Sequence, residues 1–194
     1  MAQGQIDFFT ETPNYPEGFR YEREIISADV EQVLIENIRA LPLKEFDFHG
    51  FLGKRRVKSF GWRYDYDDER LKEAEPIPDF ILPVRERAAQ FAGVSADAIQ
   101  HVLFTEYDHA GIGWHRDKAN FEDIIGVSLL APCTFRLRRK VGGRWERVSI
   151  EAEPRSAYLM RGPSRTEWEH SIPEVDGVRY SITFRTLRGG REQV

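Results

Sequence analysis

The chain has 194 residues, of which 41% are hydrophobic and 12% aromatic, so it is not a disordered polypeptide and can bury the core of a single domain spanning 1–194. Its formal charge of −4 provides no global basic field for nucleic acid, so any such binding needs a local patch. There is no apolar run long enough for a membrane span, no secretory signal pattern and one cysteine, Cys133, so we expect a cytoplasmic monomer without disulfides or a membrane or protein partner.

The N-terminal part of the sequence predicts an extended arm, a strand and a helix. Residues 1–19 contain prolines and glycines without a period, and we expect an extended arm that packs through Phe8, Phe9 and Tyr15. A short strand is predicted over 20–26, and Ser27 is a good N-cap for a helix. That helix continues to Pro42, because apolar residues recur at helical spacing, namely Val30, Leu34, Ile38 and Leu41.

A run of cations and aromatic residues follows a short strand predicted over 46–51. Between residues 54 and 66, five cations are interleaved with four aromatics, namely Lys54, Arg55, Arg56, Lys58 and Arg63 with Phe60, Trp62, Tyr64 and Tyr66. Cations hold phosphates and aromatic faces stack bases, so the run is a candidate nucleic-acid contact. The alternative is a solvated hairpin with inward aromatics. The contact is slightly favoured, because the four aromatics share strand parity and only one face can be core.

The rest of the chain predicts one more helix and then strands. The helix lies between a linker containing Pro76 and Pro78 and the residue that ends it, Gly93. Eight candidate strands follow, separated by turn residues, at 99–107, 113–117, 124–130, 134–139, 144–152, 157–161, 167–172 and 178–186. Many short strands after two helices indicate a mainly β fold, a sandwich or barrel with flanking helices.

A histidine and an aspartate two residues apart form a candidate metal site. If their segment is extended, His115 and Asp117 leave the same face and can share one cation, with His170 as the candidate third ligand. Two histidines and one carboxylate form the ligand set of non-haem Fe(II) oxygenases, which leaves positions open for substrate and O₂. Ordinary loop or core histidines are the alternative, and this spacing alone does not decide between them.

The C-terminal segment favours the metal interpretation. Asp176-Gly177 predicts a hairpin loop, which would place His170 opposite Thr183. Period-two spacing then puts four polar residues on the same face as His170, namely Arg179, Ser181, Thr183 and Arg185. Arginines bind carboxylates in a forked, bidentate manner, so two of them beside a metal ligand indicate a small dicarboxylate held at the metal.

These residues together resemble the AlkB-like family of Fe(II)- and 2-oxoglutarate-dependent dioxygenases over roughly 46–186. One motif is His115-Arg116-Asp117, and the other follows His170 and is similar to the family's Arg-x-Asn-x-Thr-Phe-Arg, namely Arg179-Tyr180-Ser181-Ile182-Thr183-Phe184-Arg185. The resemblance implies a double-stranded β-helix, or jelly roll, with its core over 99–186 and a nucleotide-recognition lid over 46–70. It also implies Fe(2+), 2-oxoglutarate and O₂.

The resemblance further implies roles for individual residues. Fe(II) would be held by His115, Asp117 and His170, while Arg179 would pair with the distal carboxylate of 2-oxoglutarate and Arg185 would lie near its metal-chelating end. Other polar residues would hydrogen-bond the cosubstrate or stand where the family often has Asn, namely Tyr107, Thr105 and Ser181. The lid would stack a flipped-out base and contact phosphates through Trp62, Tyr64 or Tyr66 and through Lys54, Arg55 and Arg56.

The activity implied by the resemblance is oxidative demethylation of N-alkylated bases in single-stranded or locally opened DNA or RNA. A hydroxylated N-methyl group would leave as formaldehyde. Many repair members carry an acid where this chain has Ala119, which weakens the expectation for methylated adenine or cytosine more than that for oxygenase chemistry. Two alternatives stay open, namely the same chemistry on a protein or small molecule, and a non-enzymatic jelly-roll binding module.

Overall fold

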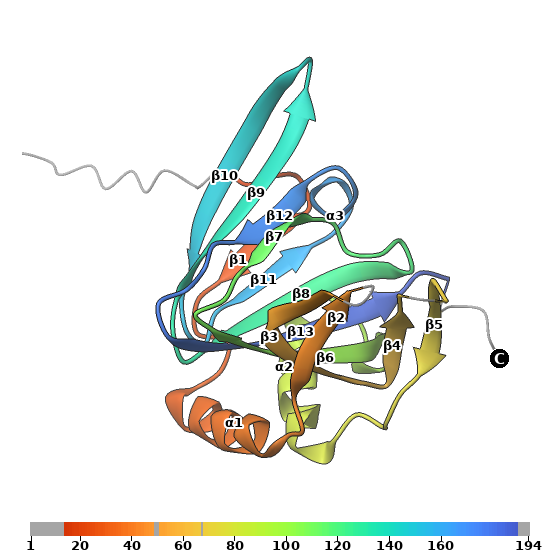
Figure 1. The fold of residues 1–194 in the computed structure, drawn as a ribbon, viewed down its shortest axis with the longest axis vertical. Coiled ribbons are helices and arrows are strands. Elements are labelled where there is room, and N and C mark those ends of the chain that lie inside the picture. The colour runs from red at the N-terminus through yellow and green to blue at the C-terminus, as the bar shows by residue number, and fades with distance from the viewer. Residues whose placement is uncertain (1–13, 49–50, 67, 190–194) are drawn as a thin grey trace, which may run out of the picture.

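A computed structural model describes residues 14–48, 51–66 and 68–189, and its body is built from two antiparallel sheets (Figure 1). The larger sheet has the strand order β1 (Phe19–Glu22), β11 (Ala157–Met160), β8 (Phe121–Leu129), β13 (Val178–Leu187), β6 (Ile99–Asp108), β3 (Phe51–Phe60) and β2 (Lys44–Phe48). The smaller sheet has the order β10 (Arg144–Ala152), β9 (Cys133–Val141), β12 (Glu169–Ile172) and β7 (Ile112–His115). A separate two-stranded ribbon is formed by β4 (Trp62–Asp65) and β5 (Arg70–Glu73).

From β6 onward the chain passes back and forth between the two sheets. Strands β6, β8, β11 and β13 belong to the larger sheet, and the strands that follow the first three of them in sequence belong to the smaller one. This alternation is the winding of a double-stranded β-helix. The predicted mainly β jelly roll with flanking helices is therefore confirmed.

The two longer helices cover the outer face of the larger sheet (Figure 1). Helix α1 (Ala28–Ala40) begins as predicted at Ser27, whose hydroxyl accepts a hydrogen bond from the Val30 amide. Helix α2 (Leu82–Ala92) follows a 3-10 turn over Asp79–Ile81 and ends at Gly93 in the left-handed conformation. Buried residues of both helices pack against the apolar face of β13, which carries Tyr180, Ile182 and Phe184.

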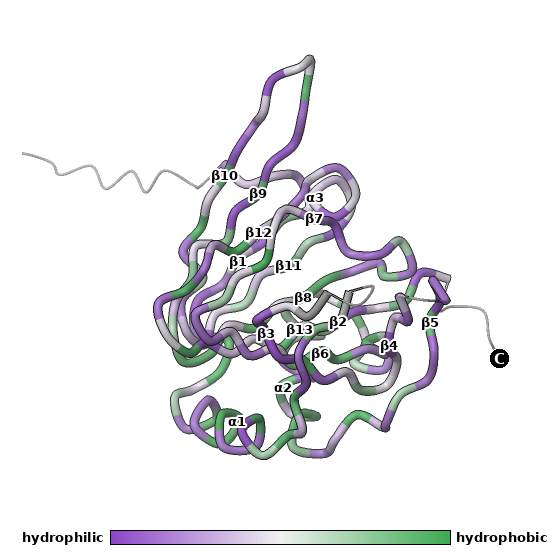
Figure 2. The backbone as a smooth tube through the Cα atoms, in the orientation of Figure 1, coloured by the Kyte–Doolittle hydropathy of each residue, from purple (hydrophilic) through white to green (hydrophobic). Residues whose placement is uncertain are grey.

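A second hydrophobic cluster fills the space between the sheets. It includes Phe135 and Leu137 of β9 and Tyr107 of β6, with Trp168 and Ile172 from the segment of β12. The hairpin of β9 and β10 extends beyond this cluster and is mostly hydrophilic, whereas the strands above the helices are rich in hydrophobic residues (Figure 2). The space between the sheets is therefore lined largely by hydrophobic side chains.

Several predicted elements need correction. The strand predicted over 46–51 spans parts of β2 and β3, and residues 49 and 50 lie outside the described residues. The turn predicted at Gly162-Pro163 leads into a short helix, α3 (Pro163–Thr166). In the first helix the apolar stripe is rotated, because Val30 is 39% exposed while Glu31 is buried and accepts a hydrogen bond from the Leu130 amide.

The predicted pairing of the last two strands is wrong. Strand β12 pairs with β7 and β9, whereas β13 pairs with β6 and β8, so His170 does not oppose Thr183. Residues 173–177 cross from one sheet to the other and are held by backbone bonds, from the Val175 amide to the Ala110 carbonyl and from the His109 amide to the Gly177 carbonyl. The turn at Asp176-Gly177 therefore joins two sheets instead of closing a hairpin.

The aromatic residues of the cationic run do not share one face. Gly61 adopts a positive φ of 74° between β3 and β4, which breaks the strand parity assumed for the run. Phe60 therefore packs into the helix-side core against Phe104, while Tyr64 joins the inter-sheet cluster. A side chain at Gly61 would collide with the Gln100 carbonyl at 2.1 Å, so this break depends on glycine.

The predicted arm falls largely outside the described residues, including Phe8 and Phe9. Where the description begins, Tyr15 packs edge-on against Phe19 with ring centroids 5.3 Å apart. Among the helices of the described chain, none is long and apolar enough to cross a membrane.

Candidate metal and co-substrate site

Three predicted ligands meet in the space between the two sheets. His115 ends β7 and is the direct pairing partner of His170 on β12, and the two imidazole centroids lie 4.1 Å apart. Asp117 follows in the loop after β7, not in the strand as expected. The candidate ligand atoms of these three residues all lie within 4.8 Å of one another. Neighbouring strands and one loop thus bring together residues that are 55 positions apart in the sequence.

Both histidines are held in the neutral form that a metal ligand requires. Nδ1 of His115 lies 2.8 Å from the Gly113 carbonyl, so Nδ1–H donates and Nε2 keeps its lone pair. Burial lowers the pKa of His115. Burial, together with the neighbouring His115, lowers the pKa of His170 to about 3. The ring of His170 also stacks on Phe135 at 5.5 Å, which fixes its orientation.

Asp117 presents one free carboxylate oxygen to the histidines. Its Oδ1 accepts hydrogen bonds from Nε and Nη2 of Arg185 at 2.9 and 2.5 Å. Its Oδ2 is buried, has no hydrogen-bond partner among the described residues and lies 3.7 Å from Nε2 of His170. Burial alone would raise the pKa of Asp117, but the positive charge of Arg185 outweighs it and lowers that pKa. An ionised, unpaired oxygen beside two neutral imidazoles is a donor set that fits a divalent cation.

Arg165 positions the loop that carries Asp117. This residue of α3 is 5% exposed, and its Nη2 donates to the carbonyls of Lys118 at 2.5 Å and Phe121 at 3.1 Å. The sequence reasoning missed Arg165, because nothing in a Gly-Pro turn indicates that the next arginine points back into the protein. It therefore belongs to the site as a residue that acts through the loop.

Arg179 is buried beside the triad with part of its guanidinium unused. It is 1% exposed, and Nη2 donates to the Ser128 hydroxyl at 2.9 Å. Its Nε and Nη1 have no partner within the part of the chain that the structure describes. The guanidinium lies 5.1 Å from the centroid of the Tyr107 ring, and the paired residues Thr105 and Ser181 line the same space. Two unused N–H groups on a buried arginine fit the carboxylate of a small acid.

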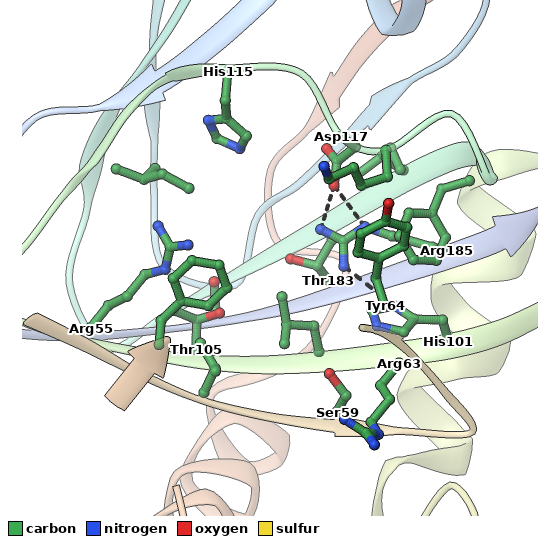
Figure 3. A pocket seen from close by; sticks show the side chains of 18 of the residues that line it. Arg55, Ser59, Arg63, Tyr64, His101, Thr105, His115, Asp117, Thr183 and Arg185 are labelled. Carbon is green, nitrogen blue, oxygen red and sulfur yellow. Dashed lines mark hydrogen bonds and ion pairs between the residues drawn. The ribbon is translucent and has the colours of Figure 1, made fainter. Parts of the chain in front are cut away.

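The triad and Arg179 line one pocket of about 1360 Å³. Figure 3 shows His115 and Asp117 among the side chains that surround it. All eight residues predicted to bind metal or cosubstrate line it, namely Thr105, Tyr107, His115, Asp117, His170, Arg179, Ser181 and Arg185. The four polar residues of β13 do share one face, as predicted, but His170 faces them from the opposite sheet. Further lining residues were not predicted, namely His101, Lys118 and Tyr158.

The predicted substrate-binding residues divide into two groups. Arg55, Tyr64 and Tyr66 line the pocket, whereas Lys54, Arg56 and Trp62 do not. Arg56 alternates with Arg55 on β3, so it points the other way and makes two hydrogen bonds to Glu106, at 2.7 and 2.8 Å. Lys54 is 73% exposed and lies 3.4 Å from Glu174. Trp62 starts β4 just after Gly61, and the residues of β4 that line the pocket are those that follow it, Arg63, Tyr64 and Asp65.

The sequence model of the 2OG-Fe(II) oxygenase superfamily matches residues 28–185, which include the triad, Arg179 and Arg185. The chain belongs to this superfamily. It is 29% identical over 164 residues to the alkylated DNA repair protein ALKBH8 homolog of Arabidopsis thaliana, covering 71% of this chain and 47% of that protein. It is 26% identical over 188 residues to the tRNA (carboxymethyluridine(34)-5-O)-methyltransferase alkbh8 of Xenopus tropicalis, covering 92% of this chain and 29% of that protein.

This 2OG-Fe(II) oxygenase therefore spans about a quarter to a half of the length of these relatives. Two solved structures share its fold. The structure of OsALKBH1 has a TM-score of 0.68 at 15% identity and covers 87% of this chain and 96% of that one. The crystal structure of a Pseudomonas putida prolyl-4-hydroxylase has a TM-score of 0.59 at 12% identity, and the match covers 88% of this chain and 93% of that one.

Membership in the superfamily confirms the AlkB-like resemblance and the prediction of a dioxygenase that uses Fe(II) and 2-oxoglutarate. The non-enzymatic binding module is no longer a competing interpretation. The unpaired oxygen of Asp117 fits an Fe(II) ion, and the unused nitrogens of Arg179 fit a carboxylate of 2-oxoglutarate.

Proposed function

We propose that this dioxygenase oxidises an alkyl group on a nucleobase of DNA or RNA. The observation that carries the proposal is one pocket that is lined both by the triad and Arg179 and by Tyr64, Tyr66, Arg55 and Lys118. The triad and Arg179 would provide the oxygenase chemistry. The two tyrosines and the two cations offer flat aromatic faces and positive charge, the two features that single nucleotides require.

Each residue of the triad and its surroundings has a role that follows from its contacts. His115, Asp117 and His170 would hold Fe(II), and Arg179 would bind the distal carboxylate of 2-oxoglutarate while Tyr107 hydrogen-bonds it. The iron and 2-oxoglutarate, when bound, supply the oxidising power to insert one oxygen atom of O₂ into a C–H bond. The protein keeps both histidines neutral, keeps Asp117 ionised and excludes water.

Arg185 has a more specific role than the sequence suggested. It was expected near the metal-chelating end of 2-oxoglutarate, and its hydrogen bonds go to Asp117 and to Nδ1 of His101, at 3.3 Å. It therefore orients the carboxylate of the metal ligand and keeps it charged. His101 is fully buried, and burial followed by the adjacent Arg185 lowers its pKa well below the usual value, so it can accept from the guanidinium.

The substrate side of the pocket supports a flipped-out base. The rings of Tyr64 and Tyr66 meet edge to face at 5.0 Å, and Nζ of Lys118 lies 4.9 and 5.1 Å from their centroids. A base must leave its stack to reach this site, so we propose single-stranded or locally opened nucleic acid as the substrate. The relatives named for DNA repair and for tRNA modification support a nucleic acid. The methyltransferase activity in the second name is not transferred, because the chain covers 29% of that protein.

Where the oxidised carbon is attached to nitrogen, the reaction is a demethylation. Hydroxylation of an N-methyl group gives a hemiaminal, whose C–N bond breaks to release formaldehyde and the unmodified base. The test is a screen of methylated DNA and RNA oligonucleotides with Fe(II), 2-oxoglutarate and O₂, read out as succinate and formaldehyde. Succinate that rises with a methylated oligonucleotide and is absent in His115→Ala supports the proposal. If peptides or small acids stimulate succinate formation and oligonucleotides do not, the proposal is wrong.

A further inference from the structure

The outer face of the smaller sheet carries charged residues that the proposed function does not use. Phe135 and Leu137 of β9 point inward to the hydrophobic cluster, so the residues that alternate with them point outward. Ile150 fixes the same alternation for β10. The outward side chains include four cations and two carboxylates, namely Arg136, Arg138, Lys140 and Arg147 with Glu151 and Glu169. This face is therefore positive although the chain has a net charge of −4.

Arg138 lies between two tryptophans on this face. Its guanidinium is 4.3 Å from the ring centroid of Trp114 on β7 and 4.3 Å from that of Trp145 on β10. The Arg136 guanidinium also lies 5.0 Å from the Trp114 centroid. Trp145 remains 38% exposed, so part of its surface is accessible to a ligand. Exposed aromatic rings beside cations on a sheet are a platform on which a base can stack.

The fold does not balance the charges of this face. Glu169 accepts a hydrogen bond from Nε of Arg138 at 2.7 Å, but the direct partner of Arg138 on β10 is a second arginine, Arg147. Like charges directly opposite each other on paired strands are destabilising. Arg136 donates to the Ser171 hydroxyl at 3.0 Å. Within the described chain, no carboxylate pairs with Arg136 or Arg147, so an anionic ligand would relieve this repulsion.

The outer face is continuous with the triad pocket across strand β7. Trp114 lines the pocket and also lies under the guanidinium groups of Arg136 and Arg138. Arg116 follows on the same strand side, lines the pocket and donates to the Glu167 carbonyl at 3.0 Å. β7 is the edge strand of its sheet, so no further strand of the described chain covers this route. The hairpin of β9 and β10 extends the face beyond the body of the protein (Figure 1).

We propose that the outer face of the smaller sheet binds the single-stranded segment of nucleic acid that flanks the target base. Its phosphates would pair with Arg136, Lys140 and Arg147, and one of its bases would stack on Trp145. The inference rests on the proposed function, which supplies the nucleic acid, and it adds a second binding surface outside the triad pocket. An acidic peptide would match the charge of this face but would make no use of the exposed tryptophan.

Oligonucleotide binding tests this surface separately from the pocket, because neither Arg147 nor Trp145 lines the pocket. The probes are labelled oligothymidylate and oligouridylate of about 15 nucleotides and an oligoglutamate of similar charge. They are titrated by fluorescence anisotropy at low salt, with the enzyme loaded with Mn(II) and 2-oxoglutarate without O₂. Arg147→Glu should weaken the tighter oligonucleotide at least about fivefold and make its binding less dependent on salt. Trp145→Ala should weaken it at least about threefold, because a stacked base is lost.

Arg87→Glu is the control of equal charge change. Arg87 is an exposed residue of α2, on the side of the larger sheet that faces away from the smaller one, and this variant should bind the oligonucleotide within about twofold of the wild type. Unchanged affinity for Mn(II) and 2-oxoglutarate shows that each variant is folded. Arg147→Gln and Lys140→Gln serve if the charge reversal prevents folding.

Three results would overturn the inference. The first is that the wild type binds neither oligonucleotide, and the second is that folded variants of Arg147 and Trp145 bind like the wild type. The third is that the oligoglutamate binds as tightly as the oligonucleotides, which would assign the face to an acidic protein. If the methylated oligonucleotide screen succeeds while these variants bind like the wild type, only the inference fails. If the variants lose affinity as expected but no nucleic acid stimulates succinate formation, only the proposed function fails.

Discussion

The buried guanidinium of Arg179 leads to a prediction with opposite effects on stability and on binding. Without 2-oxoglutarate its Nε and Nη1 have no partner among the described residues, so the charge is buried with a single hydrogen bond to Ser128. Arg179→Met keeps most of the volume and removes that charge. An unpaired buried polar group costs about 1–3 kcal/mol, so the free energy of unfolding of the cosubstrate-free protein should rise by roughly that amount.

The same substitution should greatly weaken the binding of 2-oxoglutarate. Two charge-assisted hydrogen bonds contribute about 1.5–3 kcal/mol each, so their loss should raise the Kd for 2-oxoglutarate by roughly 10²- to 10⁴-fold. Urea unfolding with and without 2-oxoglutarate measures both effects, and only the wild type should be stabilised by the cosubstrate.

Arg185→Met on the same strand is the matched control. Arg185 is paired with Asp117 inside the protein, so this change leaves a buried carboxylate without its partner and should destabilise the fold by about 3–5 kcal/mol. The two arginine variants should therefore move stability in opposite directions. If Arg179→Met destabilises the protein as much as Arg185→Met does, or retains wild-type affinity for 2-oxoglutarate, the assignment of Arg179 as an incomplete anion site is refuted.

Three further changes test the site and its support. His115→Ala should abolish 2-oxoglutarate-dependent succinate formation and weaken Mn(II) binding at least about tenfold, as followed by titration. Gly126→Ala would place a methyl group 2.2 Å from the ring of Tyr158, and it should destabilise the protein by about 1–3 kcal/mol in thermal unfolding. Folded His101 stays neutral, whereas the unfolded form gains a proton below about pH 6.5. The free energy of unfolding should therefore decrease as the pH is lowered from 6.5 to 5, by up to about 1.4 kcal/mol per pH unit. His101→Gln should make this free energy, measured by urea unfolding, less dependent on pH, and an unchanged slope would contradict the argument.

The mainly β fold and the polar face of β13 could be predicted from local patterns, whereas the jelly roll was implied by the resemblance to the AlkB-like family. Alternation of polar and apolar residues at 179–185 depends only on the strand period. The predicted polar face of this strand is therefore correct although the predicted strand pairing is wrong. The pairing itself could not be predicted, because a two-residue turn signal is the same whether it closes a hairpin or joins two sheets. What decides between these outcomes is the bonding of 173–177 to the loop at 109–110, a contact about 65 residues away in the sequence.

The lid shows the same limit at smaller scale. Five cations and four aromatics between 54 and 66 predicted a nucleic-acid contact, and three of these residues, Arg55, Tyr64 and Tyr66, line the pocket. Arg56 was included because a cation looks the same on either face of a strand, and only its partner Glu106 on β6 reveals that it points away. A long-range partner therefore separates the arginine that pairs within the fold from the arginine that lines the pocket.

The unsatisfied polar atoms give an independent indication of where ligands bind. Within the described chain, four buried side-chain atoms lack a hydrogen-bond partner, and they belong to three residues, namely Asp117, Arg165 and Arg179. Buried polar groups in folded proteins are nearly always paired, so such atoms are uncommon and need a cause. Here one is a carboxylate oxygen beside two neutral imidazoles, and two are on a guanidinium lining the same pocket. A cation and an anion would satisfy these three atoms, which is why the cost of leaving them unpaired is concentrated in this pocket and not spread through the core.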